Sequence, residues 1–438
     1  MKIFLALSSI PNPNGEAIDI VSNEVVNWLS TTSDEVFIQV IIREKKNHTY
    51  QSIEHSFNTY TNTKKNLHFK EVIYMGDMQS PRHFLYKVYI FAKDLFMSLP
   101  LIRNCVNKSF FPALIVKKKF DKAINSVNPD IIVSIWSWES LSLIYDIKNI
   151  PKYIYYGNPD HKPLEAQLES PKLFDMHKKS FFNKMKLYIT KLKNKAREIQ
   201  HLKMMNSCEM VSNNSLVDAN YYSQNGHKES LYLQNMWPSK ETPSFHEFIN
   251  SNEIKTVGSV GNLGATGNTF GLYYLGKYLI PELRKNSNKN INIDIYGGGK
   301  PRKFIQKHLN HKEINIKGWV EDIESELTKS HSFLVLTNST GFIVGNTRIL
   351  LAWSLGLCVI AHSNSCKSMP EIKHNENALI GSSPKELAEL VIKCSIDSDY
   401  RNKIGMGGYN TYSKYYKSDV VMPKMYEHIK KCHNKFGQ

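Results

Sequence analysis

Apolar positions in the first half of the chain form short runs separated by amphipathic stretches. Residues 16–29 place Ile18, Val21, Val25 and Leu29 at the spacing of one helix face. The runs that predict buried strands are residues 3–7, 36–42, 130–135, 153–156 and 209–212. Strands that alternate with helices predict a parallel sheet covered on both faces.

The same alternation begins again in the second half of the chain. A strand leads into the glycine-rich segment 256–268, and the strands 291–296 and 333–336 follow with helices between them. The composition of the polar, proline-containing segment 238–251 predicts an interdomain linker. We therefore expect two doubly wound α/β domains, at residues 1–240 and 253–410, with ligand at the carboxyl ends of the strands in the cleft between them.

Glycine-rich turns follow several of the strands in the second half. They occur at 258–267, 297–300 and 345–348, and the first and last of them lead directly into predicted helices. A strand that ends in glycines and feeds a helix leaves backbone N–H groups free at the helix N-terminus, where phosphate is stabilised. Several such turns together favour a nucleotide or a nucleotide-sugar as the ligand.

The net charge of +16 implies an anionic partner or a generally lysine-rich surface. Residues 84–119 and 178–203 mix basic, apolar and aromatic side chains, so each is either a basic helix at an anionic membrane surface or an ordinary helix with one buried face. The sequence contains no nucleic-acid recognition motif, and we expect no nucleic-acid partner.

The six cysteines contain no C-x-x-C pair, which fits neither a zinc site nor a disulfide scaffold and suits a reducing cytosol. We expect no metal, because no cluster of metal-ligating residues is evident. Residues 1–7 are better explained as a buried strand than as a signal segment. No apolar run approaches the length of a transmembrane helix.

Taken in order, these motifs resemble those of GT-B glycosyltransferases of the large family 4, the bacterial group 1 sugar transferases. The matching segments are Val257–Asn262, Ile293–Gly299, Gly318–Val320, Gly345–Ala361 and Met369–Ile372, and in the first half Pro13–Glu16, Asn128–Val133 and Leu233–Asn235.

The resemblance implies a GT-B fold with two Rossmann-like domains, whose last segment, 411–438, is a helix that packs back on the first domain. It implies transfer of a sugar from a nucleotide-sugar to a glycan or lipid-linked glycan in bacterial surface polysaccharide synthesis. It also implies retention of configuration, no metal, and a cytoplasmic location, with peripheral contact at the inner face of the membrane.

The chain departs from this family where the family carries two glutamates. Residues 339–342 contain no carboxylate, and Leu351 stands at the second position. Asn262 and a neutral residue near Asn268 stand where the family holds the diphosphate with Arg and Lys. Either the donor is held differently, or it is an unusual donor, or the chain is a degenerate sugar- or nucleotide-binding partner of an active transferase.

Arg348 is the first candidate for a phosphate contact, because it lies in the first turn of a helix that follows Gly345. Its alternative is a surface arginine paired with Glu371 or another carboxylate, and the alternative for Trp319 is a buried core residue. The other candidate donor-binding residues are Gly15, Gly261, Asn262, Gly264, Gly298, Lys300, Trp319, Val320, Thr340, Gly341, Phe342 and Thr347.

The first domain offers two further groups of candidates. Glu16, Asp160 and His161 follow strands and can contact sugar or act on the acceptor hydroxyl, although each is more often an ordinary loop or first-turn residue. Trp136, Trp138 and Glu139 leave a strand end and suit carbohydrate stacking, so they are the candidate acceptor-binding residues.

Overall fold

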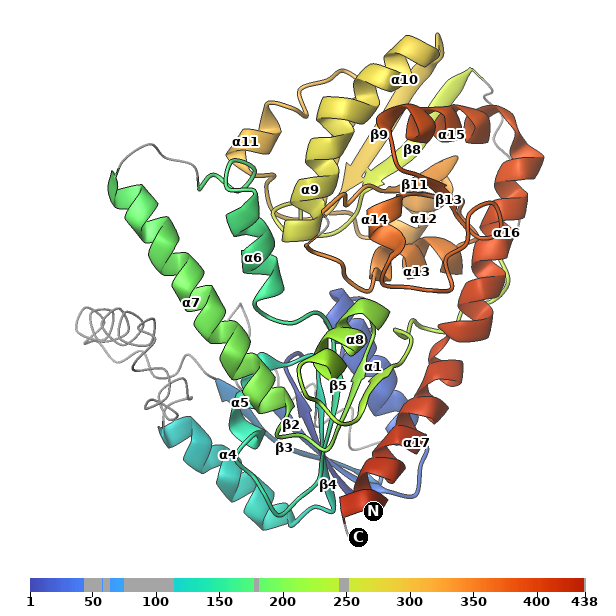
Figure 1. Cartoon of the computed structure of the whole chain (residues 1–438). Coiled ribbons are helices and arrows are strands. Elements are labelled where there is room, and N and C mark those ends of the chain that lie inside the picture. The colour runs from blue at the N-terminus through green and yellow to red at the C-terminus, as the bar shows by residue number, and fades with distance from the viewer. Residues whose placement is uncertain are drawn as a thin grey trace.

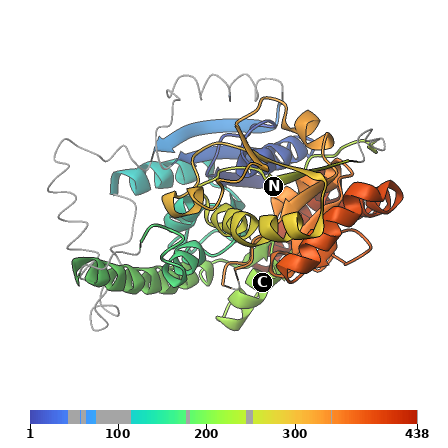
Figure 2. The ribbon, with the colours of Figure 1, turned by 90° about the horizontal axis from the view of Figure 1, so that it is seen from above.

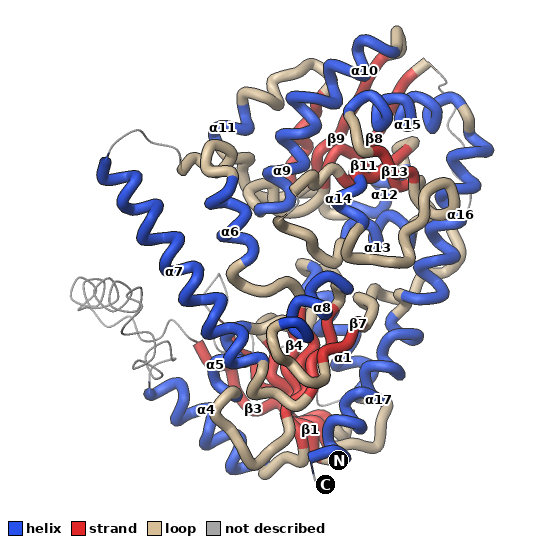
Figure 3. The backbone as a smooth tube through the Cα atoms, in the orientation of Figure 1, coloured by secondary structure: helices blue, strands red, loops and turns tan. Residues whose placement is uncertain are grey.

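The computed structural model describes residues 1–42, 57, 64–74, 114–176, 181–243, 252–339 and 341–436. These residues form two α/β halves, each built around one parallel sheet (Figure 1). Figure 3 shows the strands as two separate groups with helices around each. The predicted fold class, two doubly wound domains, is confirmed.

The first sheet has seven parallel strands in the order β3-β2-β1-β4-β5-β6-β7. The chain order reverses between β1 and β4, and this switch point is where doubly wound sheets bind ligands. The strands are β1 (Lys2–Leu7), β2 (Glu35–Ile42), β3 (Leu67–Tyr74), β4 (Ile131–Ile135), β5 (Lys152–Tyr156), β6 (Met210–Asn213) and β7 (Ser230–Tyr232).

Helices cover both faces of this sheet. Apolar residues of α1 pack on one face, and those of α4, α5 and α8 pack on the other. The helices of this half are α1 (Ala17–Leu29), α4 (Leu114–Val127), α5 (Trp138–Ile144), α6 (Lys162–Glu169), α7 (Phe181–Met205) and α8 (Leu216–Gln224).

The second sheet repeats the same topology with six parallel strands, β10-β9-β8-β11-β12-β13, and its switch point lies between β8 and β11. The strands are β8 (Glu253–Ser259), β9 (Asn290–Tyr296), β10 (Ile314–Gly318), β11 (Ser332–Val335), β12 (Val359–His362) and β13 (Leu379–Gly381). The helices are α9 (Thr266–Tyr274), the π-helical turn η1 (Leu275–Leu279), α10 (Ile280–Asn286), α11 (Lys303–Gln306), α12 (Ile323–Thr328), α13 (Thr347–Ser354), α14 (Ser363–Cys366), α15 (Pro384–Ile396) and α16 (Ser398–Tyr415).

The last helix, α17 (Ser418–Phe436), returns to the first half (Figure 1). Its residues Val421, Met422, Met425 and Ile429 are fully buried in the core of the first sheet. Both Figures 1 and 2 place α16 and α17 on the opposite side of the molecule from α7.

The chain crosses between the two halves twice, and the two crossings are hydrogen-bonded to each other. The N–H of Trp237 donates to the Tyr416 carbonyl at 2.9 Å, and the N–H of Ser418 donates to the Trp237 carbonyl at 2.9 Å. Trp237 itself is buried against the core of the second half. The link between the halves is therefore a paired, structured connection.

Candidate functional site

The glycine turns after β8 and β9 pack directly against each other. Gly261 has φ 99° and Gly297 has φ 128°, conformations that glycine adopts without strain. A Cβ atom built on Gly297 would lie 2.0 Å from the carbonyl oxygen of Gly261. The N–H of Leu263 also donates to the Gly298 carbonyl at 3.0 Å. The two turns therefore hold the predicted residues Gly261, Asn262 and Gly298 in fixed positions.

The first of these turns feeds an uncapped helix N-terminus. The Asn262 Oδ1 atom accepts a hydrogen bond from the N–H of Gly264 at 3.0 Å, which shapes the turn. The N-cap residue of α9, Ala265, provides no side-chain cap. The N–H groups of the first turn of α9 and its helix dipole therefore remain available for an anion.

The guanidinium of Arg348 lies beside this helix terminus. Its hydrogen-bond acceptors are all neutral: Asn268 Oδ1, Asn346 Oδ1 at 3.2 Å and Thr337 Oγ1 at 3.4 Å. Within the described residues, no carboxylate lies within 4.0 Å of it. Burial lowers the pKa of Arg348 to about 10, so it stays protonated at neutral pH.

A half-buried cation without a countercharge is costly, so this position is suited to an anionic ligand. The alternative that Arg348 pairs with Glu371 is wrong. The Glu371 carboxylate instead accepts hydrogen bonds from Tyr232 and Gln234, each at 2.9 Å, and from Tyr416. Arg348 is therefore free of the structural ion pair that its sequence position allowed.

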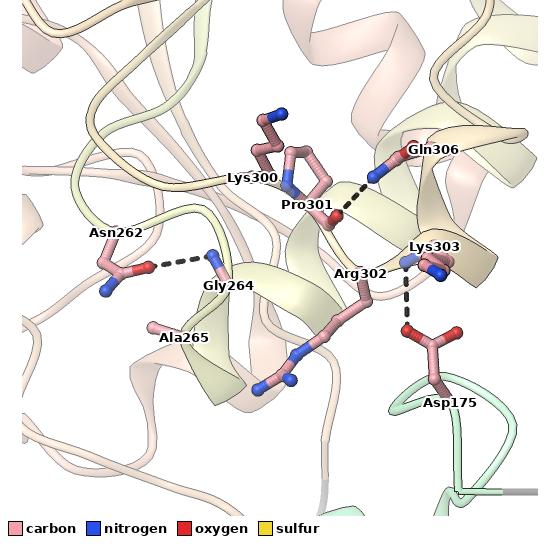
Figure 4. Close-up of a pocket in the computed structure, with 9 residues that line it drawn as sticks. All are labelled: Asp175, Asn262, Gly264, Ala265, Lys300, Pro301, Arg302, Lys303 and Gln306. Atoms are coloured by element: carbon pink, nitrogen blue, oxygen red, sulfur yellow. Dashed lines mark hydrogen bonds between the residues drawn. The ribbon is translucent and has the colours of Figure 1, made fainter.

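A pocket of about 480 Å³ opens next to the first glycine turn (Figure 4). It brings together three predicted donor-binding residues, Asn262, Gly264 and Lys300. It also contains residues that sequence reasoning missed, namely Asp175, Ala265, Pro301, Arg302, Lys303 and Gln306. Three cationic side chains and one carboxylate line this pocket, so its net charge favours an anion. The basic run after Gly299 was the available sequence signal.

The carboxylate of this pocket comes from the first half of the chain. Asp175 accepts hydrogen bonds from the N–H groups of Lys303 at 3.0 Å and Phe304 at 2.9 Å, as Figure 4 shows for Lys303. The Arg302 guanidinium lies 5.9 Å from the centre of the Phe174 ring, a cation–π distance. One wall of the pocket therefore connects the two halves.

Trp319 and Val320 follow β10 after Gly318, which has φ 74°. The Trp319 side chain is 75% exposed, so the alternative of a buried core tryptophan is wrong. Val320 is half-buried against the core of the second half. An exposed indole at this edge of the sheet has a free face on which a base can stack.

The remaining donor candidates lie in the loop between β11 and α13. Thr340 lies outside the described residues, and Thr347 is half-buried at the start of α13. Phe342 is buried and packs with Ala166, Phe174 and Phe270, so its ring joins the two halves. A Cβ atom built on Gly341 would lie 2.9 Å from the Glu169 carboxylate, so this glycine allows a close approach of the first half to the loop.

In the first half, Gly15 and Glu16 form the turn that begins α1. The N–H of Glu16 donates to Asp19 Oδ2 at 2.9 Å, and a Cβ atom built on Gly15 would lie 2.5 Å from the same oxygen. Asp19 therefore caps the N-terminus of α1, while the Glu16 side chain stays exposed. The next residues, Ala17 and Ile20, pack against the core of the second half. Glu16 thus stands at the boundary between the halves.

The candidate acceptor residues Trp136, Trp138 and Glu139 are all half-buried at the end of β4. The Trp136 ring stacks on Tyr155 with centroids 6.0 Å apart, and the Trp138 ring stacks on His201 at 5.5 Å. Trp136 has φ 44°, an uncommon conformation for a bulky residue. Each ring is therefore partly buried by its stacking partner within the first half.

Asp160 and His161 lie in a polar network between α6, α7 and α8. His161 is 2% exposed, and its Nε2 atom lies 3.5 Å from the Tyr221 hydroxyl and 4.0 Å from Glu198 Oε1. Burial lowers the pKa of His161 to about 4. Asp160 accepts a hydrogen bond from Tyr156 at 2.7 Å. This arrangement argues against His161 as a base, because its ring does not reach an open surface.

Comparison with known proteins agrees with this geometry. Residues 254–397 match the family model of group 1 glycosyl transferases. No curated protein matches the chain at a significant level.

Solved structures with the same architecture include HepE of Anabaena in complex with UDP and glucose, at 14% identity and a TM-score of 0.61, covering 98% of this chain and 99% of HepE. A TarM variant of S. aureus, in complex with UDP, fondaparinux and α-GlcNAc-glycerol, has 10% identity and a TM-score of 0.63, with 99% of each chain covered. Sucrose-phosphate synthase of Thermosynechococcus elongatus has 11% identity and a TM-score of 0.62, covering 99% of this chain and 100% of the synthase. The chain therefore shares with these glycosyltransferases a group 1 domain in its second half and the two-domain GT-B architecture throughout.

Proposed function

We propose that this protein transfers a sugar from a nucleoside-diphosphate sugar to a glycan or lipid-linked glycan. The observation that carries the proposal is the half-buried guanidinium of Arg348, which lies beside the uncapped N-terminus of α9 and has only neutral partners. HepE and the TarM variant were both solved with UDP. A nucleoside diphosphate supplies the countercharge that this site lacks.

In this proposal the diphosphate binds the first turn of α9, Asn262 and Arg348, and Lys300 approaches from the pocket side. The base lies against Trp319 and Val320, and the sugar extends toward the loop that contains Gly341. When the sugar–phosphate bond breaks, negative charge grows on the departing diphosphate. Arg348 and the fixed N–H dipoles stabilise that charge without reorganising.

We further propose that transfer retains the anomeric configuration and requires no metal ion. The support for metal independence is the set of cationic groups near the diphosphate position. In this proposal Arg348, Lys300 and Arg302 neutralise charge that a divalent cation would otherwise neutralise. His161 is buried, so no role as a dedicated base is assigned to it.

A screen of nucleotides tests the donor site. The thermal transition of the protein is measured with UDP, GDP, ADP, CMP and dTDP, each with and without EDTA. We expect the nucleotide with the preferred base to stabilise the protein by about 2.7 kcal/mol at a concentration of 100 Kd. EDTA should leave the resulting shift in the thermal transition unchanged. Absence of a shift with every nucleotide at millimolar concentration would contradict the proposed donor site, and loss of the shift in EDTA would contradict metal independence.

One observation favours a second function, a non-catalytic binding partner of an active transferase. Leu351, which replaces a glutamate of the resembled family, is only 8% exposed and belongs to the core of the second half. A leucine accepts no hydrogen bond from a ribose hydroxyl. Nucleotide binding without transfer to any glycan acceptor, and without slow hydrolysis of the donor, would favour this alternative.

We also propose that the protein acts at an anionic membrane, as part of bacterial surface polysaccharide synthesis. WaaB, a lipopolysaccharide outer core galactosyltransferase, is another structural relative, with 14% identity and a TM-score of 0.55. In the described part of the chain, no helix has the length and apolar character needed to cross a bilayer. We propose that the contact with the membrane is peripheral.

The support for membrane contact is the outer half of α7. Met185 is 46% exposed and Tyr188 is 63% exposed, beside Lys184, Lys186 and Lys191, which form no ion pair in the described part of the chain. Residues 178–180 of the predicted basic segment, and residues 84–113 of the other one, lie outside the described residues.

Replacement of these three lysines by glutamine should weaken binding to phosphatidylglycerol vesicles on the order of 100-fold, because each lysine contributes about 1 kcal/mol near an anionic surface. Vesicle co-sedimentation at fixed ionic strength measures the effect. The matched control replaces three exposed lysines of the second half, Lys373, Lys385 and Lys403. Equal losses in both variants, or equal binding to phosphatidylcholine, would contradict a defined membrane surface.

A further inference from the structure

Helix α6 belongs to the first half in sequence but packs across to the second half (Figure 1). Gln167 Nε2 donates to Thr266 Oγ1 in the first turn of α9 at 2.9 Å. Ala166 joins Phe270 and Phe342 in one apolar cluster. The end of α6 is therefore held against the two elements that form the proposed donor site.

The last residue of α6, Glu169, points its carboxylate at Gly341. A Cβ atom built on Gly341 would lie 2.9 Å from Glu169 Oε2 and 3.8 Å from Oε1. Glu169 is exposed, and within the described residues no cationic side chain forms an ion pair with it. The carboxylate is thus both accessible and able to accept new hydrogen bonds.

Gly341 also lies close to the proposed diphosphate position. A Cβ atom built on Gly267, in the first turn of α9, would lie 3.8 Å from Arg348 Nη2 and 3.6 Å from the ring of Phe342, the residue after Gly341. A sugar attached to a diphosphate at Arg348 therefore extends toward the 341–342 loop, where Glu169 lies.

We propose that Glu169 binds the donor sugar by accepting hydrogen bonds from its hydroxyl groups. Sugar hydroxyls are neutral donors, and an ionised carboxylate is a strong acceptor for them. Residues 339–342 carry no carboxylate of their own, and Glu169 supplies one from the opposite half of the chain. The inference rests on the proposed function, because it requires a sugar linked to the bound nucleotide.

This assignment separates the recognition of the nucleotide from that of the sugar. Arg348 and α9, which bind the diphosphate, belong to the second half, whereas Glu169 reaches the sugar from the first half. Loss of Glu169 should therefore weaken binding of a nucleotide-sugar and leave binding of the free nucleotide unchanged.

The test compares the Kd values of UDP, UDP-glucose and UDP-N-acetylglucosamine for the wild-type protein and for Glu169→Ala. We expect the Kd of at least one UDP-sugar to rise on the order of tenfold, and the Kd of UDP to change less than twofold. The matched control, Glu165→Ala, removes the same charge from an exposed position one turn earlier in α6, and it should change neither value.

Equal weakening of UDP and both UDP-sugars, or no weakening of either UDP-sugar, would overturn the role of Glu169 while leaving the proposed function intact. If the wild-type protein does not bind UDP, the inference is overturned, and so is the proposed function with a UDP-sugar as the donor. Glu169→Gln, which keeps one acceptor oxygen, should recover part of the lost affinity.

Discussion

Arg348→Met is expected to abolish nucleotide binding and to reduce sugar transfer on the order of 10²- to 10³-fold without lowering Tm. The wild-type guanidinium is half-buried among neutral acceptors, so the folded protein bears a desolvation cost that only a bound anion offsets. Methionine fills a similar volume without the charge. Removing the charge should therefore leave the stability of the unliganded protein unchanged or increase it.

Isothermal titration with the nucleotide found in the screen, together with Tm of the free variant, measures both effects. Lys385→Met is the matched control, because Lys385 is 72% exposed on α15 and lies outside the proposed site. Arg348→Lys keeps the charge but loses the planar fork of donors, so it should retain weak binding. A variant Arg348→Met that binds nucleotide as tightly as the wild-type protein would rule out Arg348 as the phosphate contact.

Gly297→Ala is expected to destabilise the second half by about 3 kcal/mol or more, because it combines left-handed backbone strain with overpacking. The new methyl group would meet the Gly261 carbonyl oxygen at 2.0 Å, and φ at this position is 128°. The turn that carries Asn262 must then move, so nucleotide affinity should fall as well. Tm should decrease by about 6 °C or more.

Gly298→Ala is the matched control for this prediction. It adds the same methyl group one residue later, where nothing lies within 4 Å of the built Cβ atom and φ is not positive. Thermal denaturation of both variants, followed by circular dichroism, gives the comparison. Equal Tm values for the two variants would show that the interlocked turns tolerate movement, and the fixed geometry assigned to the site would be wrong.

The fold class could be predicted from the sequence because it depends on local patterns. Short apolar runs that alternate with helical periodicity specify a parallel sheet, and both sheets have the expected doubly wound order. The turn at Gly261 and Asn262 was also readable, since a glycine turn between a strand and a helix has a local signature. The predicted strands did not include β3, because Leu67–Tyr74 mixes charged residues with its apolar ones.

The parts of the site that the sequence did not reveal depend on contacts between distant segments. Nothing in the residues around Glu169 or Asp175 indicates that they meet Gly341 and α11, more than 120 residues later. His161 follows a strand like a site residue, yet α7 and α8 bury it. A pattern along the chain cannot show which side of a loop another helix will cover.

Close helix packing in the second half gives another example. Gly405, Gly407 and Gly408 lie in α16, where single glycines normally weaken a helix. Built Cβ atoms at these positions would lie 2.1 Å from the Gly356 carbonyl oxygen, 1.9 Å from the Glu376 carbonyl oxygen and 2.3 Å from the Trp353 ring, respectively. Their purpose is visible only in the packed structure.

The hydrogen-bonded pair of crossings at Trp237 and Tyr416–Ser418 limits how the molecule can work mechanically. Two unconnected linkers would let the halves rotate and translate independently. Two crossings that are hydrogen-bonded to each other act instead as a single hinge. A movement of one half relative to the other would then be a rotation about this hinge. Helix α6 lies away from the hinge (Figure 1), and Asp175, which follows it, contacts the second half there. A small rotation about this hinge would displace Glu169 by a large distance. The proposed recognition of the sugar is therefore the step most sensitive to the angle between the two halves.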